Sequence, residues 1–130
     1  MARLRVGIVG VGRIAELHAR GYSKDSRAEI IAVCDRDEDL AIKRALDWGA
    51  RHYYTEFDEM LANDEIDAIE IITPNYLHGR QALAALKAGK HVSVERPIAT
   101  TVEEADQVLA AADERGLTLQ VYEPCLFYKP

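Results

Sequence analysis

The sequence RVGIVGVGRIA, residues 5–15, decides the fold of this chain. Its short apolar run, residues 6–9, predicts a buried β-strand, and a helical pattern follows the glycines. Between them, Gly10 permits a tight turn, Gly12 lets a ligand phosphate approach the backbone, and Ala15 leaves room for the helix to pack on the strand. The order of strand, glycine turn and helix therefore predicts a nucleotide-binding turn.

Two further features of this region indicate a dinucleotide ligand. The helix that the turn opens directs free N–H groups and the positive end of its dipole toward bound phosphates. An acidic residue, Asp35, ends the next apolar run about 20–25 residues further on, as the dinucleotide fingerprint requires. The alternative is a glycine-rich turn with a purely structural role.

Composition narrows the class of protein. The 130 residues suffice for one domain with a hydrophobic core, and 48% hydrophobic with 29% charged residues is ordinary for a globular protein. The net charge of −6, without a cluster of Lys and Arg, argues against nucleic acid or an anionic membrane as partner. No apolar run approaches the roughly 18 residues of a membrane span, and the N-terminal residues lack the apolar core of a signal peptide. Cys34 and Cys125 lack metal-ligand spacing, so we expect a cytoplasmic protein with free thiols.

Apolar runs alternate with helical patterns along the whole chain. Strands are expected at residues 4–9, 28–34, 52–55, 67–72, 91–94 and 117–122. Helices are expected at residues 13–22, from 35–39 to Gly49, around 57–61, at 76–88, and from Val102 to a cap at Gly116. This alternation predicts right-handed βαβ units in a three-layer α/β/α fold of the Rossmann type. Its doubly wound parallel sheet is expected to have about six strands, in the order 3-2-1-4-5-6.

Two residues of this pattern need a separate interpretation. Glu70 lies in the expected fourth strand, where a buried carboxylate without a partner is costly. Either Glu70 faces a partner or its end of the strand reaches water, and we expect a structural role. His18, on the first helix, is expected to be a packed or partly exposed helix residue rather than a ligand.

Ligands of such sheets bind at the carboxyl ends of the strands, beside the switch point between the first and fourth strands. Polar, charged and turn-forming residues gather at this edge. They are residues 10–14, Asp35 and Arg36, residues 73–78, residues 95–97, and Glu123.

Three stretches carry a resemblance to a known family: GIVGVGRIA at 7–15, TPNYLH at 73–78 and AGKHVSVERPIA at 88–99. Together they resemble the Gfo/Idh/MocA family, and the resemblance covers essentially the whole chain. It implies an NAD(P)-dependent oxidoreductase of sugars, polyols and related carbonyl compounds. In that family a cofactor domain like this one precedes a larger, mostly β domain that binds the substrate and forms the oligomer interface.

The resemblance also implies roles for individual residues. The backbone of residues 12–14 would border the pyrophosphate, and Asp35 would accept hydrogen bonds from the adenosine ribose. Residues 73–75 and His78 would line the path toward the nicotinamide ribose, which Glu95 would adjoin. The expected cofactor-binding set is Gly10, Gly12, Arg13, Ile14, Asp35, Arg36, Thr73, Pro74, Asn75, His78, Glu95, Pro97 and Glu123, with Arg96 as the catalytic residue and no metal site.

Cofactor choice is predicted from the end of the second strand. The Asp35 carboxylate can bind two ribose hydroxyls and repels a 2′-phosphate, whereas Arg36 partly offsets that repulsion. NAD(H) is therefore the expected cofactor, with NADP(H) as the alternative. The Arg96–Pro97 bond is expected to be cis, because a tight turn must follow the fifth strand and the family resemblance also implies a cis bond there.

The sequence departs from the family pattern in two places. The family usually has Glu-Lys-Pro where this chain has Glu95-Arg96-Pro97. Arginine keeps the charge but does not give up its proton, so Arg96 can bind or polarise a substrate oxygen without acting as a base. Residues 122–130 lack the Asn and Arg common there, which points away from a typical sugar substrate.

The family's substrate domain would follow this chain. We therefore expect residues 1–122 to be a dinucleotide-binding domain and residues 123–130 to begin the link to a substrate domain, so that the chain alone is inactive and the full-length parent forms a homo-oligomer. A natural one-domain protein is the alternative. Competing functions are a non-catalytic module that senses NAD(P)H and a methyltransferase that uses S-adenosylmethionine; the two later family motifs argue against the methyltransferase.

Overall fold

Six strands form a single parallel sheet in the order β3-β2-β1-β4-β5-β6 in the computed structural model, which describes residues 2–122. The strands are β1 (Leu4–Val9), β2 (Ala28–Cys34), β3 (His52–Tyr54), β4 (Ala68–Ile71), β5 (His91–Glu95) and β6 (Leu119–Tyr122). The predicted order is confirmed. The largest difference in bounds is at β6, which begins at Leu119 instead of residue 117.

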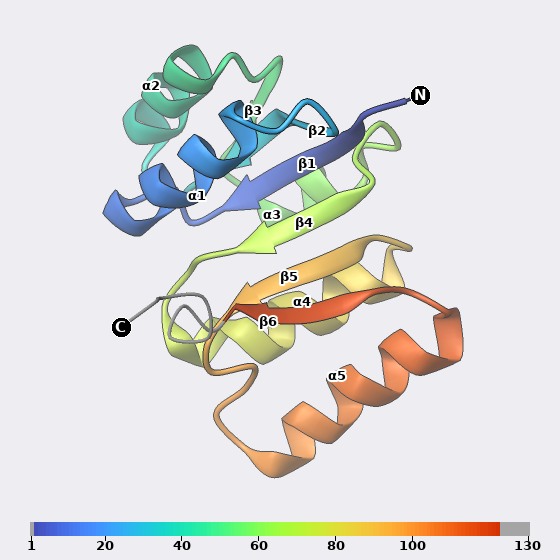
Figure 1. The fold of residues 1–130 in the computed structure, drawn as a ribbon. Helices are drawn as coiled ribbons and strands as arrows, with labels where there is room; N and C mark the ends of the chain where they lie inside the picture. The colour runs from blue at the N-terminus through green and yellow to red at the C-terminus, as the bar shows by residue number, and fades with distance from the viewer. Residues whose placement is uncertain (1, 123–130) are drawn as a thin grey trace, which may run out of the picture.

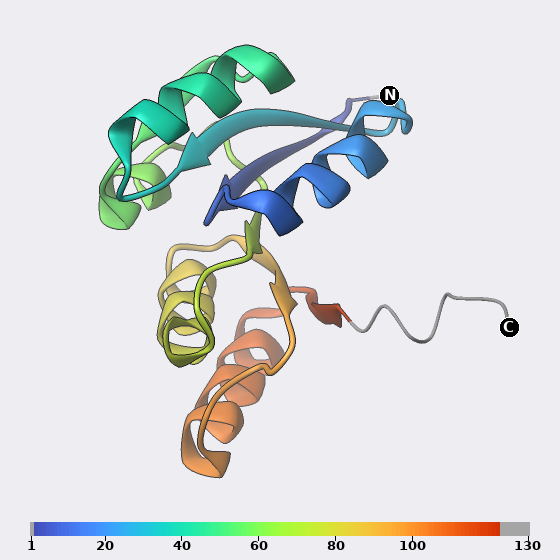
Figure 2. The ribbon, with the colours of Figure 1, turned by 90° about the vertical axis from the view of Figure 1, so that its left-hand side faces the viewer.

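Helices cover both faces of this sheet, as Figure 1 shows. They are α1 (Arg13–Ser23), α2 (Glu38–Trp48), α3 (Phe57–Leu61), α4 (His78–Lys87) and α5 (Val102–Arg115), with a short 3-10 turn η1 (Asn75–Leu77) before α4. Figure 2, turned by 90°, shows α1 and α4 on opposite sides of the sheet. The chain changes face after β3 because the strand order reverses there while each crossover stays right-handed.

Two hydrophobic cores lie between the layers. Ala15 and Ala19 of α1 pack with Val6 and Ile8 of β1 on one face. The larger core on the other face joins the apolar sides of β4 and β5 to α3, α4 and α5. Ala15 is fully buried, which confirms that its small size lets α1 lie close to the sheet.

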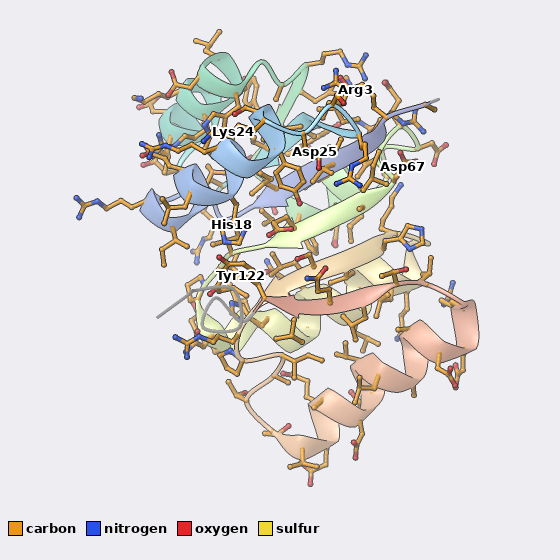
Figure 3. All side chains as sticks on the ribbon, in the orientation of Figure 1. Arg3, His18, Lys24, Asp25, Asp67 and Tyr122 are labelled. Carbon is orange, nitrogen blue, oxygen red and sulfur yellow. The ribbon has the colours of Figure 1, made fainter. Side chains whose placement is uncertain are left out.

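The half of the sheet formed by β4, β5 and β6 presents a polar face on the side of α1. Side chains alternate along these strands, so that Ile69 and Ile71 enter the core while Glu70 points the other way. Glu70 is buried against α1, where it binds His18 and the Tyr22 hydroxyl. The structural interpretation of Glu70 is therefore confirmed, and the carboxylate faces partners rather than water. In Figure 3, His18 of α1 and Tyr122 of β6 meet on this side of the sheet.

Candidate functional site

The glycine turn between β1 and α1 is closed on one side and open on the other. Gly10 has φ +83°, and a Cβ there would lie 2.5 Å from the Ile72 carbonyl oxygen, so no other residue fits without strain. Gly12 is the N-cap of α1, with φ −71°, and a Cβ at this position would meet nothing within 4 Å. The expected role of Gly10 in a tight turn is confirmed. The space beside Gly12 belongs to a cleft rather than to the protein core.

Val11, the residue between these glycines, is held through both of its backbone polar groups. The Val11 N–H donates to Asp35 Oδ2 over 3.1 Å, and the Arg44 Nε donates to the Val11 carbonyl over 3.0 Å. Arg44 comes from α2 and is almost buried; its guanidinium also pairs with Glu16 of α1 and lies over the ring of Trp48. The turn is thus joined to the end of β2 through Asp35 and to α2 through Arg44 without a bound ligand. The sequence analysis did not identify this role of Arg44.

A cleft of about 740 Å³ opens at the carboxyl ends of β1, β2 and β4. This volume lies within the range of about 300–1,000 Å³ that is usual for small-molecule sites. Of the predicted set, the cleft brings together Gly10, Gly12, Asp35, Arg36, Thr73 and Pro74. It also contains Tyr76 and Leu77, from the stretch 73–78 expected at this edge, and residues that the sequence analysis did not place there, namely Thr55, Glu56, Phe57, Arg80 and Gln81.

The Asp35 carboxylate is oriented by backbone N–H groups. Oδ2 accepts the Val11 N–H, and Oδ1 accepts the Asp37 N–H over 2.9 Å. Each carboxylate oxygen has two acceptor positions, so both oxygens keep capacity for hydroxyl donors from the cleft. Arg36, the next residue, is exposed on the same wall.

His78 connects the segments that follow β4 and β5. Its ring is fully buried, with Nε2 2.6 Å from the Thr73 carbonyl oxygen and Nδ1 2.7 Å from the Pro97 carbonyl oxygen. His78 is therefore buried and contacts the backbone carbonyls that follow β4 and β5, and its expected place along the path to the nicotinamide ribose stays a prediction. The Arg96–Pro97 bond is cis, as predicted.

The other predicted residues lie outside the lining of this cleft. Arg13 and Ile14 are exposed in the first turn of α1, and Asn75 is exposed in η1. Glu95 ends β5 half-buried, and Arg96 and Pro97 follow it at the surface. Glu123 and Cys125 lie outside the described residues.

A buried cluster adjoins Glu95. His18 Nδ1 is 2.6 Å from Glu70 Oε1, and His18 Nε2 is 3.3 Å from Glu95 Oε2. Burial alone lowers the pKa of His18. The hydrogen bond and charge of Glu70, together with Glu95, raise the pKa by more than burial lowers it, so the net shift is upward. The prediction that His18 packs on the helix holds, yet its link to two carboxylates was missed. Glu70 was the available signal, because a buried carboxylate requires a partner.

A second groove, of about 570 Å³, lies between α1 and α2, away from the carboxyl ends of the strands. Charged side chains of both signs line it, including Arg20 and Asp47. Within residues 2–122, no group of three or more His, Cys, Asp or Glu side chains could hold a metal ion. In the same part of the chain, no helix is both long and apolar enough to cross a bilayer.

The doubly wound sheet, the open glycine turn at a helix N-terminus and the carboxylate after β2 define a dinucleotide-binding domain of the Rossmann class. Comparison with known protein families gives the more specific assignment. Residues 4–123 match the profile described as "Oxidoreductase family, NAD-binding Rossmann fold", and the chain belongs to this Gfo/Idh/MocA family.

The chain is also similar to individual oxidoreductases. The chain is 36% identical over 118 residues to 4-carboxy-2-hydroxymuconate-6-semialdehyde dehydrogenase from Sphingobium sp., covering 91% of this chain and 38% of that protein. The WlbA dehydrogenase from Bordetella pertussis, solved with NADH and UDP-GlcNAcA, matches with TM-score 0.87 and 34% identity over 92% of this chain and 37% of that one. A variant of KijD10, a 3-ketoreductase from Actinomadura kijaniata solved with TDP-benzene and NADP, matches with TM-score 0.92 and 30% identity over 97% and 40%. The chain thus spans little more than a third of the length of these relatives.

Proposed function

We propose that this chain is the cofactor-binding domain of an NAD(P)-dependent oxidoreductase that acts on a sugar, polyol or related carbonyl or hydroxyl compound. The observation that carries the proposal is the open side of Gly12, which faces the same cleft as Asp35. A bound nicotinamide cofactor would accept or supply the hydride. The residues of this chain bind that cofactor and orient it.

The cleft suits the adenosine and pyrophosphate part of a dinucleotide. The first-turn N–H groups of α1 lie beside Gly12 and suit a pyrophosphate, because that end of a helix dipole is positive. Asp35 suits the adenosine ribose, and Tyr76 offers an exposed ring on the same wall for an adenine. We assign Glu95, at the end of β5, to the nicotinamide ribose.

NAD(H) is the proposed cofactor, with NADP(H) as the alternative. Both Asp35 oxygens are oriented by N–H donors, so the carboxylate stays in place to bind ribose hydroxyls and to repel a 2′-phosphate. Arg36 on the same wall is a cation that favours the phosphate.

Arg96 is proposed to hold and polarise an oxygen of the substrate. A guanidinium can grip a carboxylate or a pair of oxygens through two hydrogen bonds, and it remains charged at any working pH. The proton donor of the reaction therefore lies elsewhere in the protein. The name of the Sphingobium relative includes a carboxylated substrate, which supports a substrate with such a group.

The remaining parts of the proposal concern the longer protein. We propose that residues 1–122 form the cofactor domain, that residues 123–130 begin the link to a substrate domain, and that this chain alone does not turn over substrate. The support is the share of each relative that the chain covers, 38% for the Sphingobium dehydrogenase. A homo-oligomer of the longer protein belongs to the same proposal.

Calorimetric titration tests the binding function. NADH is expected to bind the 130-residue chain, and S-adenosylmethionine is expected to give no heat of binding. Binding of S-adenosylmethionine without binding of NADH would overturn the proposal in favour of a methyltransferase.

A second candidate is a module that senses NAD(P)H without catalysis, which Arg96 in place of the usual lysine favours. Oxidation of NADH by the longer protein, measured with a panel of carbonyl compounds that includes carboxylated aldehydes and keto sugars, separates the two. Substrate-dependent oxidation supports the oxidoreductase. Tight NADH binding with no oxidation across the panel would support the sensor.

A further inference from the structure

We propose that His18 is a positioning residue, an imidazolium that bridges Glu70 of β4 and Glu95 of β5 and thereby holds Glu95, outside the lining of the cleft, in place for the nicotinamide ribose. The inference rests on the proposed function, because that function assigns Glu95 to the nicotinamide ribose. It adds a residue from α1 and a dependence on protonation that the family resemblance does not supply.

The two contacts of the imidazole differ in kind. Nδ1 makes a hydrogen bond of 2.6 Å to Glu70 Oε1. Nε2 lies 3.3 Å from Glu95 Oε2 without the alignment of a hydrogen bond, and neither atom has another hydrogen-bond partner among the described residues. The side chains of His18 and Glu70 are almost fully buried, and that of Glu95 is 18% exposed. The attraction between His18 and Glu95 therefore depends on the charge of the imidazole.

Only the doubly protonated ring satisfies both carboxylates. A neutral imidazole carries one N–H, and the short contact with Glu70 takes it at Nδ1. The Nε2 lone pair would then face the Glu95 carboxylate, and the two would repel each other. With the second proton, the same geometry becomes an ion pair at each nitrogen.

Glu70 is the fixed member of the pair. Its second oxygen, Oε2, accepts the Tyr22 hydroxyl over 2.9 Å, and burial and the charge of Glu70 raise the pKa of that phenol, so Tyr22 remains a donor. Both oxygens of Glu70 are thus held by hydrogen bonds. Loss of the proton at His18 Nε2 therefore changes the position of Glu95 rather than that of Glu70. Glu95 ends its strand and is followed by the cis Arg96–Pro97 turn.

The surroundings of His18 favour its charged form. Glu70 faces it from β4, Glu95 from β5 and Tyr22 from α1, and the Tyr122 ring of β6 meets it edge-on at 4.7 Å. Asp25 lines the hollow that opens beside this cluster. The titratable groups in these contacts are thus acidic or phenolic, and Arg96 follows Glu95 in the chain. The upward shift of the His18 pKa agrees with this arrangement.

A comparison of two ligands isolates the effect on Glu95. NADH carries the nicotinamide ribose that we assign to Glu95, whereas ADP carries only the adenosine and the diphosphate. In the 130-residue chain at pH 6, His18→Gln is expected to weaken NADH about tenfold, the size of one hydrogen bond to a charged group, and to leave ADP affinity unchanged. Arg20→Gln, an exposed substitution two residues further along α1, is the matched control and should change neither affinity.

A second measurement uses the unaltered chain, so it does not depend on the folding of a variant. The ¹⁵N chemical shifts of the His18 ring are expected to show an imidazolium that titrates above the usual value of 6.5. As the pH rises and the His18 imidazolium loses its proton, the ratio of NADH affinity to ADP affinity should fall in the unaltered chain. The same ratio should not change with pH in His18→Gln.

The outcomes separate this inference from the proposed function. If the chain binds neither NADH nor ADP, the proposed function fails and the inference fails with it. If the chain binds both, but His18→Gln weakens both equally or His18 is already neutral at pH 6, only the positioning role of His18 is wrong.

Discussion

Gly10 and Gly12 lie two residues apart, yet the protein needs them for different reasons. A Cβ at Gly10 would clash with the backbone of Ile72 and Thr73, whereas a Cβ at Gly12 would meet nothing within 4 Å and would lie beside the open cleft. One glycine therefore serves the fold and the other serves the ligand. Their substitutions should separate stability from binding.

Gly12→Val should leave the protein folded and lower NADH affinity at least about tenfold, or about 1.4 kcal/mol, because the new side chain fills the space of the pyrophosphate. Gly10→Ala is the contrasting variant, and it should lower the free energy of unfolding by about 1–3 kcal/mol through backbone strain. Calorimetry gives the affinities and thermal unfolding gives the stabilities. Equal NADH affinity in Gly12→Val and the unaltered chain would remove Gly12 from the site.

Asp35→Asn should weaken NADH about tenfold and narrow the preference for NADH over NADPH. The asparagine keeps the shape of the side chain but loses the charge that repels a 2′-phosphate. Asp37→Asn is the control, because Asp37 caps α2 and asparagine caps equally well. A preference for NADPH in the unaltered chain would show that Arg36 outweighs Asp35.

Sequence reasoning found the residues whose role depends on backbone position, and it missed those whose role depends on a distant partner. Gly10, Gly12 and Asp35 follow from their places in one βαβ unit. His18 was predicted only as a packed or partly exposed helix residue, and Arg44 lies in a helix that was predicted only as a range. A helical pattern does not give the carbonyl or carboxylate that a side chain meets.

At the scale of elements, Arg44 joins α2 to the glycine turn and to α1. Its three polar contacts are made from an almost buried side chain. The turn that we assign to the pyrophosphate is thus shaped by a residue more than thirty positions further along the chain.

Arg44→Met should lower both NADH affinity and the free energy of unfolding, the latter by about 1–3 kcal/mol, because the Val11 carbonyl loses its partner. Arg44→Lys should recover little of the NADH affinity or the stability that Arg44→Met loses, since an ammonium cannot bind Val11 and Glu16 together as the forked guanidinium does. Lys43→Met, an exposed neighbour on α2, is the control. Unchanged NADH affinity in a folded Arg44→Met protein would contradict this role.

At the opposite end of the sheet, Arg5 and Asp67 join β1 to β4. The Asp67 carboxylate accepts the Arg5 N–H and two guanidinium hydrogens. The side-chain hydrogen bond from Arg5 holds the pKa of Asp67 below its usual 3.8, against the opposing effect of burial. A lowered carboxyl pKa stabilises the fold above the unfolded pKa, and that stabilisation is lost as the pH falls through the folded pKa.

Asp67→Asn should therefore reduce stability at pH 7 by up to about 1 kcal/mol, the upper range for an exposed ion pair. It should also reduce the further loss of stability below pH 3.8. Denaturant unfolding between pH 2 and pH 7 measures both effects. Asp106→Asn is the control, because Asp106 is exposed on α5 and lies in neither β1 nor β4. An acid profile of Asp67→Asn identical to that of the unaltered chain would contradict the assignment.

At the scale of the whole molecule, the alternation of strands and helices sufficed to predict the strand order. The right-handed crossover rule leaves few alternatives once the strands are placed, and the observed order is β3-β2-β1-β4-β5-β6. The polar face of β4, β5 and β6 could not be predicted in detail. Its contacts depend on where α1 ends over the sheet, and His18 and Tyr22 reach Glu70 only in the folded chain.

The topology also decides which of two grooves is the proposed cofactor site. The cleft with Gly12 lies at the carboxyl ends of the strands, and the groove between α1 and α2 does not. Ligands of open α/β sheets bind at the carboxyl ends, beside the point where the strand order reverses.

The most direct test of this account is the amide ¹H–¹⁵N spectrum of the chain during titration with NADH. The largest shift changes should fall on the amides of residues 10–14, 35–36, 73 and 75–77, which surround the cleft at the ends of β1, β2 and β4. Changes concentrated instead around Arg20, Asp47 and Trp48, in the groove between α1 and α2, would contradict it, as would an unchanged spectrum at saturating NADH.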